Sequence, residues 1–120
     1  MNVEARGRVF DVHGARIIHA ADVELDSDEQ VTFVSRTGSE FDVARKAWGY
    51  YATPSLNKRL PDHRLRPVLT MNPDNKMALL LVEIGHEAAF EEYMTSQGMR
   101  VVWWLDTDEQ VDELERRLCG

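Results

Sequence analysis

The sequence predicts one α+β domain spanning residues 1–120. N-terminal antiparallel β-hairpins, forming either a sheet or a small barrel, should precede a unit with the order β-hairpin, helix, strand, helix. The prediction rests on apolar residues that alternate with polar ones in the first third of the chain, as in half-buried strands. The last third instead places apolar residues at helical spacing. Its 120 residues, 43% hydrophobic and 29% charged, are typical of a single globular domain.

Two strands are predicted over residues 3–12 and 15–25, with a turn at His13-Gly14 between them. Side chains alternate across a strand, so every second residue of the second strand shares a face. These residues are mostly apolar, which predicts that their face is buried: Ile17, His19, Ala21, Val23 and Leu25.

The next segments predict a hairpin, an ambiguous aromatic stretch and a short helix. Glycine in the loop 36–39 favours a hairpin between strands 31–35 and 40–43. Residues 48–52 fit either a strand or a packed loop. Thr53 has the chemistry of a helix N-cap, and the helix that it begins should stop at Pro61.

A second hairpin is predicted over residues 66–71 and 76–84, because the four residues between them have strong turn chemistry. The helix that follows, 87–97, should end at Gly98 and bury a stripe formed by Phe90, Tyr93 and Met94.

The C-terminal strand is predicted over residues 101–105. Because a helix connects it to strand 76–84, the two strands should run parallel in one sheet. Thr107 should begin the last helix, with Gln110 completing a capping box. The apolar stripe of this helix consists of Val111, Leu114 and Leu118.

Charge and cysteine content exclude several classes of function. A net charge of −7 argues against general binding to nucleic acid or to anionic membranes, which a basic surface would favour. The longest apolar run, Met77–Val82, is far shorter than the roughly 20 residues that span a bilayer. The chain has one cysteine, Cys119, and no recognisable signal sequence at its N-terminus. We therefore expect a cytoplasmic protein.

Positive charge gathers in residues 44–68, which carry six basic residues and one acidic residue. Arginine suits carboxylate or phosphate, and a helix beginning at Thr53 would add free backbone N–H groups. Tyrosine offers a flat face to a ring-bearing ligand. Residues 50–66 are therefore predicted to bind a small anionic or aromatic molecule. The predicted binding residues are Tyr50, Tyr51, Thr53, Ser55, Asn57, Lys58, Arg59, Arg64 and Arg66.

Acid–base candidates lie at the predicted strand ends. Glu83 and His86 follow one strand and Asp106 follows the other, so parallel strands would bring them to one edge of the sheet. A histidine beside a carboxylate can transfer protons at neutral pH, and His63 is a further candidate. The same positions also suit ordinary helix capping.

Metal and cofactor sites are not predicted. Asp11, His13 and His19 have the chemistry of zinc ligands, but their spacing matches no metal motif.

Three functions fit these observations. The first is a small binding protein that holds an anionic or aromatic molecule within residues 50–66. The second is an accessory domain that self-associates, as a homodimer, or binds another protein through the acidic and basic surfaces. The third is a small enzyme that uses the acid–base candidates. No set of nucleophile, base and orienting residue is evident, so we rank the enzyme last.

Overall fold

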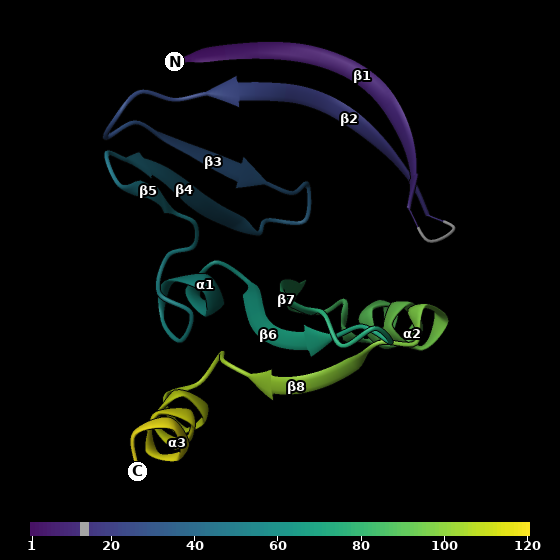
Figure 1. Ribbon diagram of the computed structural model, residues 1–120, viewed down its shortest axis with the longest axis vertical. Coiled ribbons are helices and arrows are strands. Elements are labelled where there is room, and N and C mark those ends of the chain that lie inside the picture. Colours follow the sequence, from purple (N-terminus) through teal and green to yellow (C-terminus); the bar gives the residue numbers. More distant parts are fainter. Residues whose placement is uncertain (13–14) are drawn as a thin grey trace. The chain divides into compact units, whose positions relative to one another are not determined.

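The computed structural model of the chain describes residues 1–12 and 15–120 (Figure 1). Within these residues the fold is mixed α+β, with eight strands in three antiparallel sheets, three helices and no closed barrel. The predicted fold class is confirmed, and of its two N-terminal alternatives the structure has sheets. The predicted turn at His13-Gly14 lies outside the described residues.

The chain divides into two compact units, which we describe separately. The first consists of residues 1–31 and 43–52, and the second of residues 32–42 and 53–120. The interpretation of residues 1–120 as one domain stays a prediction.

In the first unit, strand β1 (Asn2–Val12) pairs antiparallel with strand β2 (Ala15–Glu24), which confirms the first predicted hairpin. The predicted burial of one face of β2 is wrong for its larger apolar residues. Ile17 is 50% exposed and Val23 is 39% exposed, although both belong to the face predicted to be buried. This sheet has only two strands, and so small a sheet offers little apolar surface for packing.

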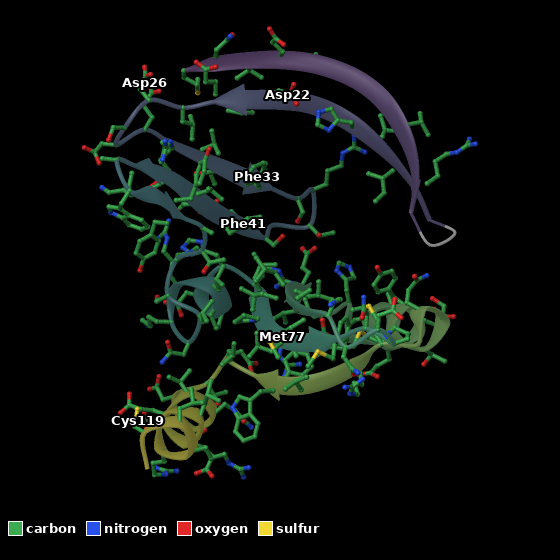
Figure 2. All side chains as sticks on the ribbon, in the orientation of Figure 1. Asp22, Asp26, Phe33, Phe41, Met77 and Cys119 are labelled. Carbon is green, nitrogen blue, oxygen red and sulfur yellow. The ribbon has the colours of Figure 1, made fainter. Side chains whose placement is uncertain are left out.

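The second sheet has the order β3 (Gln30–Val34), β4 (Glu40–Lys46) and β5 (Gly49–Tyr51). The second predicted hairpin is thus confirmed, and the ambiguous aromatic stretch contributes a strand. Its loop contains Gly38 at φ +99°, a conformation that favours glycine. Phe33 and Phe41 lie on the neighbouring strands β3 and β4, with ring centroids 5.1 Å apart (Figure 2).

The third sheet lies within the second unit and has the order β7 (Met77–Glu83), β6 (Leu65–Met71) and β8 (Arg100–Trp104). β6 pairs antiparallel with both neighbours. β7 and β8 therefore run parallel to each other, as predicted, with β6 between them. This arrangement leaves β7 and β8 as the two edge strands of the sheet.

Helices α2 (Glu87–Gln97) and α3 (Asp108–Cys119) contact consecutive residues of β8. Phe90 of α2 packs edge-on against Trp104, with ring centroids 5.9 Å apart. Trp103 instead donates its indole N–H to the carbonyl of Gln110 in α3 at 2.9 Å. Side chains alternate along a strand, so the two helices contact side chains on opposite faces of β8.

Among the residues whose burial the structure describes, the buried apolar ones of the core belong to the second unit. They belong to β6, β7 and α2 or lie outside these elements, and none belongs to α3: Leu60, Leu65, Val68, Val82, Met94 and Leu105. The predicted stripes are buried only in part, because Tyr93 is 47% exposed and Leu118 is 77% exposed. No helix in the described residues has the length and apolar character needed to cross a membrane.

Candidate functional site

The short helix α1 (Arg59–Asp62) begins five residues later than predicted and contains Pro61. The prediction that Thr53 starts a helix is therefore wrong, as is the prediction that Pro61 ends it. The hydroxyl of Ser55 accepts a hydrogen bond from the N–H of Arg59 at 2.9 Å, so a turn precedes the helix. The free N–H groups expected after Thr53 do not form a helix terminus there.

Polar residues of the predicted binding segment are paired within the second unit. Asn57 donates to Asp108 at 2.9 Å, and Lys58 lies 3.0 Å from Asp62. Arg59 contacts the carboxylate of Asp42 through two nitrogens, at 2.9 and 3.0 Å. The pKa of Asp42 is lowered by a hydrogen bond from Thr32 and then by Arg59. The carboxylates in these pairs already balance the positive charges that an anionic ligand would need.

The two tyrosines of that segment belong to the first unit, whereas Thr53 and the residues after it belong to the second. Tyr50 is 57% exposed, and the guanidinium of Arg45 lies 5.1 Å from its ring centroid. Tyr51 is 56% exposed.

Arg66 is held between two carboxylates and an aromatic ring. Its Nε donates to Asp106 at 2.7 Å, and its Nη1 lies 3.4 Å from Glu87. Its guanidinium also lies 4.2 Å from the ring centroid of Trp104. The hydrogen bond to Asp106 is the main cause of a raised pKa at Arg66. Arg66 thus joins the end of β8 to the start of α2.

Glu83, at the end of β7, is the centre of a second polar cluster. It accepts hydrogen bonds from the hydroxyls of Thr37 and Ser35, which lower its pKa together with the nearby His86 and Arg64. His86 Nδ1 lies 3.4 Å from the carboxylate. A carboxylate with a lowered pKa stays ionised at neutral pH, so Glu83 is suited to orient its neighbours rather than to donate a proton.

The other predicted site residues lie around this cluster. Arg64 donates to the carbonyl of Ile84 at 2.9 Å and has φ +72°, a strained conformation for a residue other than glycine. His63 Nδ1 lies 3.2 Å from Glu40. The structure thus brings Glu83 and His86 together, whereas His63 contacts Glu40 and Asp106 contacts Arg66. The catalytic role of these candidates stays a prediction.

The metal candidates are described only in part. His13 lies outside the described residues, and His19 contacts Asp22 at 2.7 Å. Within the described residues, no three histidine, cysteine or acidic side chains come together as a metal site.

Strand β7 exposes one side of its main chain. The N–H of Ile84 donates to the carbonyl of Arg64 at 2.8 Å, so these two residues form a hydrogen-bonded pair that continues the register of the β6–β7 ladder. Such pairs occur at every second residue of an antiparallel ladder. The main-chain groups that point toward β6 are therefore those of Ala78, Leu80 and Val82. Those of Leu79 and Leu81 point away from β6.

Since β7 is an edge strand, the groups of Leu79 and Leu81 are free of ladder partners within the described residues. Edge strands of this kind tend to pair with another chain unless charge, proline or a bulge protects them. β7 has a regular register over its full length and no charged residue before Glu83. From the sequence, this apolar run indicated only that the segment is too short to span a membrane.

A hollow of about 370 Å³, which we call the β7 groove, lies between β7 and α2. It is lined by residues 80–83 of β7 and by His86, Ala89, Phe90 and Tyr93. Four consecutive strand residues include both faces of the strand, so the groove follows the outer edge of β7.

A second hollow of about 250 Å³, which we call the hairpin hollow, lies on the other face of β7. Its walls are mostly apolar, and its polar end contains the Glu83 cluster. The lining residues are Phe33, Val34, Ser35, Ser39, Phe41, Leu65, Leu81 and Glu83. Leu81 and Glu83 line both hollows, so the two flank one segment of the exposed edge.

Comparisons with protein-family models, with curated proteins and with solved structures found no match to this chain.

Proposed function

We propose that this chain is a protein-interaction domain that binds an extended segment as an added strand along the outer edge of β7. The observation that carries the proposal is the main chain of Leu79 and Leu81, which has no ladder partner among residues 1–12 and 15–120 and lies beside two apolar hollows. In strand addition, main-chain hydrogen bonds supply affinity and hollows for alternate side chains supply specificity.

The two hollows fit the geometry of an added strand. Successive side chains of a strand point to opposite faces of a sheet. An added segment would therefore direct one set of side chains toward α2 and the other toward Phe33 and Val34. Both sides are apolar and accessible, because Tyr93 is 47% exposed and Val34 is 73% exposed. The preferred segment is thus apolar on both faces.

An anionic or aromatic ligand within residues 50–66 has less support. Arg59 and Arg66 already contact carboxylates at 3.0 Å or less. A ligand would have to displace these partners and leave the carboxylates unpaired. The observations therefore favour the interaction domain over the small-molecule binder.

The test is a selection of short random peptides on the full-length protein, followed by NMR mapping of those that bind. We expect extended apolar peptides that shift the amide signals of Leu79 and Leu81. The variant Leu81→Pro removes an outward N–H without breaking the ladder to β6, and should weaken binding at least about tenfold. Peptides that bind Leu81→Pro equally well, or that shift signals in residues 50–66 instead, contradict the proposal.

Leu79→Lys is a second variant in case Leu81→Pro does not fold, because Leu79 is 38% exposed and tolerates a long side chain. Val101→Lys is its matched control. Val101 is 39% exposed and lies on the opposite edge strand, so its substitution should leave peptide binding unchanged.

A further inference from the structure

We infer that the strand added to β7 is β7 of a second copy of this chain, paired antiparallel about a two-fold axis through Leu80. This inference rests on the proposed function, because it names the occupant of the same edge. The third sheet of each copy would then join that of the other copy into one continuous sheet across the dimer. Each copy would contribute the same surface.

The positions of the outward main-chain groups along β7 support pairing between two copies of this strand. The outward main-chain groups belong to Leu79 and Leu81, which lie symmetrically on either side of Leu80. A two-fold rotation about Leu80 places Leu79 opposite Leu81 of the second copy, and Leu81 opposite its Leu79. Outward groups therefore meet outward groups, as each hydrogen-bonded pair of an antiparallel ladder requires.

The charges of β7 select the antiparallel direction. Glu83 is the only charged residue of the strand, and this register places it opposite Met77 of the second copy. This register therefore brings no like charge opposite Glu83. A parallel in-register pair would instead set two Glu83 carboxylates side by side, which is destabilising.

The hollows fit the same register. Leu79, Leu81 and Glu83 share one face of β7, and Leu81 lines the hairpin hollow. Leu79 of the second copy, which lies opposite Leu81, would enter that hollow. On the other face, Leu80 of each copy lies beside the β7 groove, where the exposed Tyr93 would cover the pair.

The other edge of the sheet is less suited to pairing. β8 has an irregular register opposite Leu69 and Thr70, whereas β7 pairs regularly with β6 from end to end. A bulge twists an edge and interrupts the row of main-chain groups that a second strand would need. β8 also begins with the charged residue Arg100.

Sedimentation velocity of the full-length protein tests the dimer. We expect the wild type to dimerise, and Leu79→Lys to raise the dimer dissociation constant at least about tenfold. Val101→Lys should leave that constant unchanged. A wild-type monomer at every concentration overturns the inference, and so does a dimer that both variants weaken equally.

Disulfide trapping tests the register in a Cys119→Ser background. In the proposed dimer the two Leu80 residues form a non-hydrogen-bonded pair, with Cα atoms about 4.5 Å apart. That separation suits a disulfide, so Leu80→Cys should yield covalent dimer under mild oxidation. Ala78→Cys is the control, because two residues at position 78 would lie about 13 Å apart. Covalent dimer from Ala78→Cys but not from Leu80→Cys overturns the register.

The peptide experiment separates the two ideas. A monomeric protein that still binds extended peptides at Leu79 and Leu81 retains the strand-addition function and rules out self-pairing. A monomeric protein that binds no such peptide would contradict both the strand-addition function and self-pairing.

Discussion

Arg66 lies over Trp104, with the guanidinium carbon 4.2 Å from the ring centroid, and at the same time donates to Asp106 at 2.7 Å. The Asp106 side chain is only 11% exposed and that of Arg66 is 30% exposed. Phe90 packs edge-on against the same Trp104 ring, with ring centroids 5.9 Å apart. The arginine therefore connects β6, β8 and the helix that forms one wall of the β7 groove.

Replacing Arg66 should destabilise the fold. Arg66→Met keeps the apolar stem but leaves the Asp106 carboxylate without its main partner, which should cost about 2 kcal/mol in the free energy of unfolding. Urea denaturation at a fixed protein concentration measures this cost, since self-association would make stability depend on concentration. Arg36→Met, in an exposed loop, is the control and should change stability by less than about 0.5 kcal/mol. Equal effects of the two substitutions would contradict the structural role of Arg66.

Thr107 should stabilise the start of α3. Its hydroxyl accepts a hydrogen bond from the N–H of Gln110 at 3.2 Å, and its backbone is extended, as in an N-cap. Thr107→Ala should therefore lower the free energy of unfolding by about 1 kcal/mol, while Thr107→Ser should retain most of it. Urea denaturation of the two variants side by side gives the comparison. A serine variant as unstable as the alanine variant would show that the hydroxyl does not act as the cap.

The sequence was most informative where one local rule decides the structure. Alternating side chains identified β2, the capping residues Thr107 and Gly98 identified helix ends, and turn chemistry identified the β6–β7 hairpin. It failed at α1, because Thr53 and Pro61 satisfy rules for helix ends that the observed turn overrides. It also failed for the burial of Ile17, which depends on which surfaces pack together rather than on alternation.

The candidate site was harder to predict than the fold. A charge-rich segment suggested a ligand site, but Arg59 and Arg66 find carboxylates far away in the sequence, at Asp42 and Asp106. Such long-range pairing has no local pattern. The apolar run of β7 was visible, yet its position at the edge of the sheet follows only from the strand order. The sequence pattern of an apolar strand is the same whether the strand lies at the centre of a sheet or at its edge.

Gly98 should be difficult to replace at the end of α2. Its φ is +63°, and a Cβ atom there would lie 3.2 Å from Cγ of Pro73. Gly98→Ala should cost about 1 kcal/mol or more from the backbone conformation alone. Gly98→Asn keeps the same Cβ contact but tolerates the left-handed conformation better, so it should cost less. Thermal denaturation measures both. Equal losses would assign the effect to Pro73 instead of the backbone.

Glu83 should make stability depend on pH in the acidic range. Hydrogen bonds from Thr37 and Ser35 lower its pKa in the folded protein below the ordinary value of 4.5. A carboxyl group with a lowered folded pKa stabilises the protein above its unfolded pKa, and this contribution is lost as the pH falls through the folded value. Glu83→Gln should therefore reduce the loss of stability between about pH 6 and about pH 3, measured by urea denaturation at each pH.

Thr37→Val provides the complementary test of this carboxylate. It keeps Glu83 but removes the hydroxyl that lowers its pKa most, so the folded pKa should rise toward the unfolded value. The variant should consequently be less stable than the wild type at neutral pH and should converge on it in acid. NMR titration of the Glu83 side chain in both proteins reports the pKa directly. A pKa of Glu83 that does not rise in Thr37→Val would contradict the assignment, whatever the stability of the variant.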